Sequence, residues 1–147
     1  MPDKQKTQKA NYGRMKSSKA FEIFPQIITH LKKGSKLTAN DIENLEKLFG
    51  DRVQKALELI GEKKVKKYIF IPSGVYRWVV TGQGKDYLVI EKTFCSCRDF
   101  LFTALLRREA PSCYHLLARE IAEKIEQFEE IILDDEKYSE NMAIWLS

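Results

Sequence analysis

The 147-residue sequence has few cysteines and histidines and no long apolar run. It contains three cysteines and two histidines, and all three cysteines lie between residues 95 and 113. No apolar stretch approaches the roughly 20 residues that a membrane-spanning helix needs, and the N-terminus lacks the apolar block of a secretory signal. We therefore expect no membrane contact and a reducing, cytoplasmic compartment (nuclear if the source is eukaryotic), where clustered cysteines indicate a metal or catalytic site rather than disulfides.

Charge is unevenly distributed along the chain. Residues 1–20 hold six basic residues and one acidic residue, residues 21–119 hold 17 basic and 11 acidic residues, and residues 120–147 hold nine acidic and two basic residues. A basic body with an acidic end suits a polyanion on one surface and a basic partner on another. The alternative is that these charged side chains are merely solvated surface and bind no partner.

The first part of the chain predicts a polar arm followed by helices. Residues 1–18 are basic and nearly free of aliphatic side chains, so we expect a disordered arm. Apolar residues then recur at helical spacing over residues 24–31, 42–49 and 53–60. Thr38 or Asn40 is the expected N-cap of the second helix, and a glycine follows each of the last two segments.

From residue 64 the pattern changes to β-structure and then returns to helix. VKKYIFIP, VYRWVV and DYLVIEKTF predict a three-stranded antiparallel sheet, with a hairpin turn at Gly82 and Gly84. Residues 100–105 suggest a short helix that Pro111 closes, and Ser112 is placed to cap the next one. That last helix is predicted from an apolar stripe of Leu117, Ile121, Ile125, Phe128 and Ile132. The predicted fold class is α+β: N-terminal helices, a small antiparallel sheet, a metal-binding unit and C-terminal helices.

Cys95, Cys97, Cys113 and His115 are the candidate metal ligands. Three thiolates and an imidazole form a set that zinc prefers, in a tetrahedron with Zn–S near 2.3 Å and Zn–N near 2.0 Å. Cys-x-Cys at the end of a strand lets both sulfurs reach one ion if the backbone bends between them. Positions i and i+2 diverge by about 200° in a regular helix, so Cys113 and His115 must straddle a helix start. The spacing predicts a closed structural site with one Zn²⁺ per chain.

Two other interpretations of these residues stay open. Three buried structural cysteines beside a capping histidine would need no metal. A Cys113–His115 nucleophile would need an activated thiolate with a base and an orienting group, and the sequence offers no Gly-rich phosphate loop and no acidic dyad. We expect no enzymatic activity and no catalytic residues.

Cys-x-Cys, a spacer and Cys-x-His, entered by strands and left through a helix, resembles the SWIM zinc-finger family. LEKLFGDRVQKALELI, SGVYRWVV, CSCRDFLFTALLRRE and CYHLLARE are similar to the small SWIM proteins of the Shu-complex type. The resemblance covers about residues 40–125 and departs from the family at Arg98, where proline is more frequent. It does not cover the basic N-terminal arm or the apolar end. From the length of the chain we expect one domain over residues 19–147, a SWIM-type zinc domain with an N-terminal helical part and its zinc finger at about 76–125.

The resemblance also implies a function in homologous recombination and DNA repair. Proteins of this type pair with a RecA-like recombinase paralogue and support the recombinase on single-stranded DNA. The apolar residues around Trp145 and the acidic last helix are candidate contacts for the ATPase. The basic arm is a candidate for direct DNA contact, as are Lys63, Lys64, Lys66 and Lys67, with Tyr76, Arg77 and Trp78 available for stacking.

Each of these surfaces has a second interpretation. The lysines could instead guard an edge strand, and Trp145 could pack back onto the domain. At the level of function, the alternatives are a free-standing or transposase-associated nucleic-acid-binding module, and an adaptor that uses the zinc unit only for protein contact.

Overall fold

A computed structural model of the chain describes residues 26, 28, 29, 31, 33–91, 93–106 and 112–147. The predicted arm at residues 1–18, most of the first predicted helix and Pro111 lie outside these residues. The described elements are α3 (Ala39–Phe49), α4 (Arg52–Gly61), β1 (Val65–Ile71), β2 (Tyr76–Thr81), β3 (Asp86–Ile90), β4 (Phe94–Cys95), η1 (Phe100–Leu106), α5 (Tyr114–Ile125), β5 (Glu129–Asp134), η2 (Asp135–Lys137) and α6 (Tyr138–Leu146). Within the described residues, no helix has the length and apolar character needed to cross a membrane.

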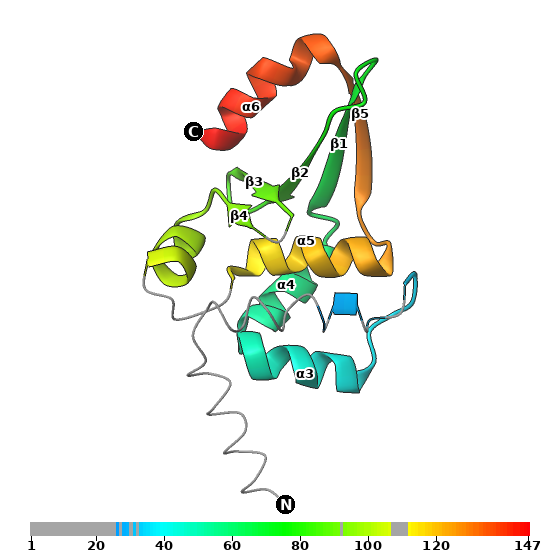
Figure 1. The fold of residues 1–147 in the computed structure, drawn as a ribbon, viewed down its shortest axis with the longest axis vertical. Coiled ribbons are helices and arrows are strands. Elements are labelled where there is room, and N and C mark those ends of the chain that lie inside the picture. Colours follow the sequence, from blue (N-terminus) through cyan, green and yellow to red (C-terminus); the bar gives the residue numbers. More distant parts are fainter. Residues whose placement is uncertain (1–25, 27, 30, 32, 92, 107–111) are drawn as a thin grey trace, which may run out of the picture.

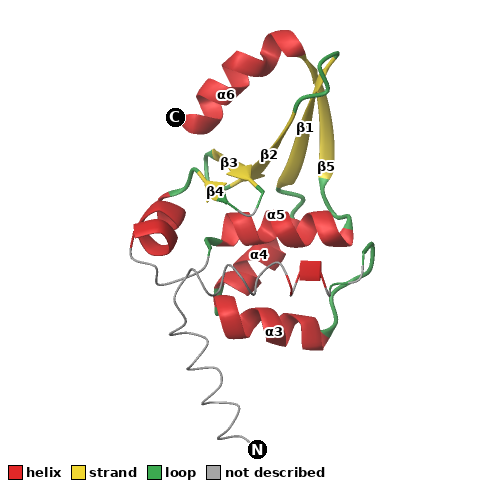
Figure 2. Cartoon of the chain, in the orientation of Figure 1, coloured by secondary structure: helices red, strands yellow, loops and turns green. Residues whose placement is uncertain are grey.

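The predicted α+β class is confirmed, and the elements form layers around one sheet (Figure 1). Helices α3, α4 and α5 are stacked at one end, the strands rise from α5, and α6 lies across the other end. Figure 2 shows that the sheet separates α6 from the three stacked helices. The three stacked helices and α6 therefore cover opposite sides of the sheet.

The sheet has five strands in the order β4-β3-β2-β1-β5, so the prediction of three was too few. β1, β2 and β3 form the predicted antiparallel meander, with Val65 opposite Val80 and Trp78 opposite Val89. β4 is a two-residue addition, too short for a period-2 pattern to reveal it. The fifth strand, β5, pairs in parallel with β1.

β5 corrects the prediction of one long last helix. α5 ends at Ile125, and Glu126 adopts a left-handed conformation with φ 58° and ψ 41° that stops the helix. Phe128 and Ile132 continue the helical spacing of three and four residues only by coincidence, because the chain forms a strand from Glu129. From Glu130 to Asp134, the side chains of EEIILD alternate between exposed and half-buried positions. The strand pairs with β1, and its backbone hydrogen bonds to β1 outweigh the weak helical pattern of the sequence.

The ends of the N-terminal helices agree with the sequence. Thr38 is the N-cap of α3: its hydroxyl accepts from the Asp41 N–H at 3.1 Å, and the Asp41 carboxylate accepts from the Thr38 N–H at 2.9 Å. This reciprocal pair is a capping box with Asp41 at the third helical position, and it satisfies two backbone donors. Gly50 ends α3 with φ 60°, a conformation that glycine adopts without strain.

Two apolar clusters lie on opposite faces of the sheet. The first face carries Val65, Trp78, Val80 and Val89, which pack against α3, α4 and α5. The second cluster consists of Phe70, Val79, Leu88 and Trp145, so it lies between the sheet and α6. The strands alternate between the two because successive side chains of a strand point to opposite faces.

Trp145 packs back onto the domain. Its side chain is 2% exposed, and its ring lies 4.7 Å from Tyr68 and 6.4 Å from Phe70 between centroids. A buried indole cannot dock a separate chain without unpacking α6. Of the apolar residues around it, Ile144 and Leu146 are the exposed ones.

Candidate metal centre

The four predicted ligands come from two elements that meet beside α5. Cys95 is the last residue of β4, where it pairs with Val89 of β3, and Cys97 follows in the turn before η1. Cys113 is the N-cap of α5 and His115 lies in its first turn. The predicted straddling of a helix start is therefore confirmed, although the cap is Cys113 and not Ser112. The Ser112 hydroxyl donates to the Cys113 carbonyl instead, at 2.9 Å.

The structure brings these four side chains together. The three sulfurs and one imidazole nitrogen lie within 4.8 Å of one another, and all four residues are buried. A tetrahedral zinc ion separates its ligand atoms by roughly 3.3–3.8 Å, given its bond lengths. The cluster needs only a small contraction to reach that geometry. The donor set and its burial fit a zinc ion with no coordination position left for water or substrate.

Backbone N–H groups orient two of the sulfurs. The Phe100 N–H donates to the Cys97 sulfur at 3.3 Å, and the Leu116 N–H donates to the Cys113 sulfur at 3.4 Å. Such bonds stabilise thiolate over thiol, and the N-terminal end of α5 adds its positive dipole at Cys113. The Phe100 bond closes the turn through Arg98, so arginine at this position is compatible with the geometry.

The His115 ring is oriented by packing. Neither of its nitrogens has a hydrogen-bond partner within the described protein, although both are buried. Tyr87 and Tyr114 lie against the ring, with centroids 4.6 Å and 4.2 Å away. A buried imidazole without partners carries a desolvation cost that a coordinated metal would offset.

The thiol pKa values show why the cluster needs a cation. Hydrogen bonds from the Cys113 and Cys95 thiols hold the pKa of Cys97 far below its ordinary value. Donating to Cys113 and Cys97 raises the pKa of Cys95, and burial raises the pKa of Cys113 to about 12. Among the three sulfurs, the surroundings therefore favour the thiolate form at Cys97. A divalent ion stabilises the further thiolates that coordination requires.

Similarity to known proteins supports this interpretation of the site. No model of a known protein family matches the chain. The chain is 32% identical over 115 residues to the zinc finger SWIM domain-containing protein 7 homologue of Dictyostelium discoideum. The aligned region covers 77% of this chain and 74% of that protein. The chain belongs to the family of zinc finger SWIM domain-containing protein 7. The proteins named zinc finger SWIM domain-containing protein 7 in Mus musculus and Homo sapiens are 25% and 24% identical over 122 residues, 81% of this chain and 79% and 86% of theirs.

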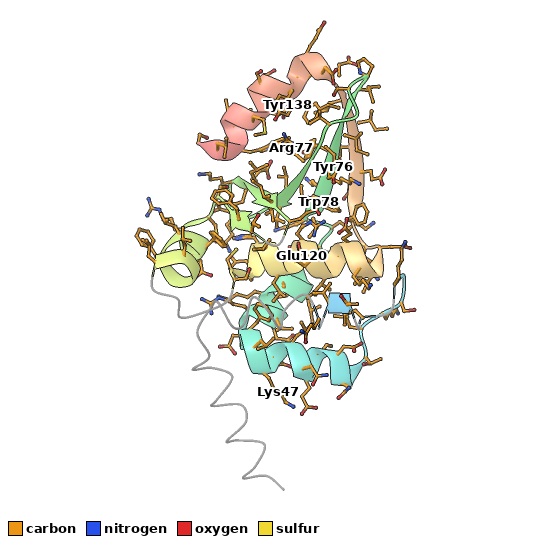
Figure 3. All side chains as sticks on the ribbon, in the orientation of Figure 1. Lys47, Tyr76, Arg77, Trp78, Glu120 and Tyr138 are labelled. Atoms are coloured by element: carbon orange, nitrogen blue, oxygen red, sulfur yellow. The ribbon has the colours of Figure 1, made fainter. Side chains whose placement is uncertain are left out.

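The SWIM ligand pattern and the buried Cys₃His cluster together identify a zinc-binding module. Sequence reasoning singled out the four residues of this cluster because their types are rare in this chain and closely spaced. It did not find the polar cluster on the next turn of α5. Figure 3 shows Glu120 on this helix and Trp78 on the sheet above it.

Arg119 is the centre of this polar cluster and is 1% exposed. Its guanidinium lies 4.4 Å from the Trp78 ring and pairs with Glu123 at 2.6 Å, Glu91 at 3.3 Å and the buried Glu120. The pair with Glu91, the residue after β3, connects the end of that strand to the helix that carries Cys113 and His115. In sequence, Arg119 and Glu120 look like surface charges, and only the burial of both sides of α5 shows otherwise.

The four lysines proposed for DNA do not form one surface. Lys63 is exposed, and Lys64 pairs with Glu62 at 3.0 Å. Lys66 and Lys67 point to opposite faces of β1, because they are adjacent residues of one strand. In the sheet register, Lys66 lies beside Glu129 and Lys67 beside Glu130.

The aromatic residues of β2 also differ from the expectation. Trp78 is 2% exposed and packs against Phe128 at 4.8 Å, so it has no free face for a base. Arg77 points to α6, where its guanidinium donates to the Tyr138 hydroxyl at 2.8 Å (Figure 3). Tyr76 keeps 45% of its surface exposed, with the Lys67 ammonium 4.5 Å from its ring. Only Tyr76 among them is available for stacking.

The spacer between the cysteine pairs forms a short π-helix, η1, with an exposed apolar surface. Phe100 is buried and packs against Phe94 at 5.7 Å, which fixes η1 beside the metal cluster. Four apolar side chains face solvent: Leu101, Phe102, Leu105 and Leu106. The sequence contained a signal for this surface, because FLFTALL is apolar around most of a single short helix that cannot bury every side.

Proposed function

We propose that this protein is a non-enzymatic, zinc-dependent factor of homologous recombination and DNA repair. It binds a RecA-like ATPase paralogue and supports the recombinase on single-stranded DNA. One structural zinc ion per chain holds the fold and takes no part in chemistry, because three cysteines and a histidine fill its tetrahedron. Membership of the SWIM family and the exposed apolar side chains of η1 support this proposal.

The exposed surface of η1 is the observation that carries the protein-binding part. Its exposed fractions rise from 42% at Leu101 to 62% at Leu106. Contiguous apolar side chains on a soluble protein mark interaction sites, and large anchors dominate interface energies. The metal cluster and Phe100 hold this segment in place, so a partner would meet a preorganised surface and lose less conformational entropy on binding.

Affinity purification from the native cell with mass spectrometry tests the partner. We expect the wild-type chain to recover a RecA-like ATPase, and the double variant Leu105→Ser/Leu106→Ser to lose at least nine-tenths of it. Leu146→Ser is the matched control, because Leu146 is equally exposed at 55% but lies on α6. Zinc content should be the same in all three proteins. Recovery of specific partners without any RecA-like protein would contradict the proposal.

The DNA-binding part rests on the basic arm and on Lys63 and Lys64. Binding of single-stranded DNA should weaken steeply with salt, with a log–log slope of about −0.7 for each phosphate neutralised. We expect removal of residues 1–20, which carry six basic residues, to flatten the slope more than Lys63→Ala/Lys64→Ala does. Fluorescence anisotropy from low to high salt, with the ATPase partner present, measures both effects.

One observation favours an alternative. The carboxylates of Glu129 and Glu130 beside Lys66 and Lys67 reduce the positive field of this strand, which suits an adaptor that contacts only proteins. Retained ATPase binding without any effect on DNA would establish the adaptor. Tight DNA binding by the isolated chain would instead establish a free-standing nucleic-acid-binding module.

A further inference from the structure

β5 is the long open edge of the sheet. It pairs with β1 over six residues, and the sheet order places no strand on its other side within the described chain. Glu129, Glu130, Ile132 and Asp134 are exposed, and Ile131 and Leu133 are half-buried. Such an edge presents unpaired backbone N–H and C=O groups, which can accept a further strand.

The face of β5 that points away from α6 carries a defined pattern. The register places Ile132 beside Ile69, and Ile69 opposite Tyr76, so that these three side chains form an apolar row across three strands. Ile132 is 61% exposed and Tyr76 45% exposed, so this row is uncovered. Glu130 and Asp134 lie on either side of Ile132 on the same face of the strand.

The residues of β1 show which kind of sequence pairs with β5. Its Lys66 and Lys67 lie beside Glu129 and Glu130 in the register. Beyond them, the apolar residues of β1 face the apolar residues of β5: Tyr68, Ile69 and Phe70 beside Ile131, Ile132 and Leu133. A strand on the outer edge meets the same β5 side chains from the other side, so it needs the same order of charge and apolarity.

We propose that the outer edge of β5 binds an extended segment of a partner protein by strand addition. Basic residues of that segment face Glu129, Glu130 and Asp134, and its apolar residues face Ile131 to Leu133. Backbone hydrogen bonds supply affinity, and the three carboxylates select for positive charge.

A second copy of this chain is a poor occupant of the same edge. Pairing β5 with another β5 places carboxylates close to carboxylates in either direction, since both ends of the strand are acidic, and like charges across a strand pair are destabilising. The acidic ends thus oppose self-association and leave the edge open to a basic strand. This surface lies on the opposite side of the molecule from η1 (Figure 1), so its test does not depend on the function proposed above.

A labelled peptide with the core KKYVVK is the probe, and the full-length zinc-loaded protein is the target. We expect binding by fluorescence anisotropy, with slower amide hydrogen exchange across residues 129–134. Glu129→Gln/Glu130→Gln should weaken binding at least tenfold, whereas the control Glu43→Gln/Glu58→Gln, which removes two exposed carboxylates from α3 and α4, should change it less than twofold. The charge-reversed peptide EEYVVE and a KKYVVK peptide with alternate N-methylated amides should not bind.

Three results would overturn the proposal. The first is equal binding of the N-methylated peptide, since strand addition requires those amides. The second is a concentration-dependent dimer in analytical ultracentrifugation that Ile132→Thr abolishes, which would make a second copy the occupant. The third is peptide binding that appears only after removal of residues 1–20, which would assign the edge to the protein's own basic arm.

Discussion

The face of the sheet toward α5 and the face toward α6 bury apolar side chains on very different scales. On the α5 side, the core extends through three helices and includes Cys95, Cys97 and Cys113 themselves. On the α6 side, the buried cluster is Phe70, Val79, Leu88 and Trp145, with half-buried neighbours around it. One side is organised around a metal cluster, and the other depends on a single indole.

This contrast shows where stability and adaptability are located. The metal cluster joins β4, η1 and α5, so the elements on that side are expected to form or unfold together. Helix α6 contributes one fully buried side chain, and local opening free energies are low where few apolar contacts hold an element. A substitution on one side of the sheet should therefore leave the other side largely unchanged.

Loss of the metal should have the largest effect. Cys97→Ser removes a ligand, and we expect it to abolish stoichiometric zinc binding and largely unfold the protein. Structural zinc sites contribute on the order of 10–16 kcal/mol of apparent binding free energy, comparable to or larger than the about 5–15 kcal/mol stability of a domain. Elemental analysis and far-UV circular dichroism measure the two outcomes.

Arg98→Ala is the matched control, because Arg98 is exposed and adjacent to Cys97 but is not a ligand. It should retain zinc and unfold like the wild type. A Cys97→Ser protein that stays folded and metal-free would show that the cluster is an ordinary buried core.

Trp145→Ala should have a large effect confined to the other face. Truncation of a buried tryptophan costs about 3–5 kcal/mol, and here it should release α6 while the zinc content stays unchanged. Hydrogen exchange should become faster in residues 138–146 and remain slow in α5. The control Ile144→Ala, at a side chain 54% exposed, should change stability by less than about 0.5 kcal/mol. Zinc loss in Trp145→Ala would mean that the two faces are coupled.

Thr38→Ala should have the smallest effect. It removes the hydroxyl that caps α3, and such caps contribute about 1 kcal/mol. The change lies on the metal-dependent side but far from the ligands, so zinc affinity should not change. Chemical denaturation of the zinc-loaded protein measures the difference in unfolding free energy. Thr38→Ser retains the hydroxyl and should restore most of the lost stability.

The sequence predicted the parts of the molecule in which local chemistry decides the structure. The four residues of the Cys₃His cluster were identifiable from residue type and spacing, and their approach follows from a strand end meeting a helix start. The α3 cap and the meander of β1, β2 and β3 were also predicted, because capping residues and period-2 patterns are local signals.

The remainder depends on contacts between distant residues. β5 had the spacing of a helix, and only its pairing with β1 selects the extended state. Trp145 was ambiguous because a large apolar residue near a chain end fits a core and an interface equally well. The lysines of β1 looked like a continuous basic stretch, but strand alternation and the carboxylates of β5 divide them. The predicted partners and the repair function remain proposals.

The parallel pairing of β1 and β5 has a consequence for synthesis of the protein. A ribosome makes β1 long before β5, since Ile71 precedes Asp134 by most of the second half of the chain. At about 5–20 residues per second, one edge of this interior strand waits roughly 3–13 seconds for its neighbour. A stalled or prematurely terminated product would keep that edge uncovered permanently. Nascent chains of this protein should therefore engage cellular chaperones until β5 has left the ribosome and paired with β1.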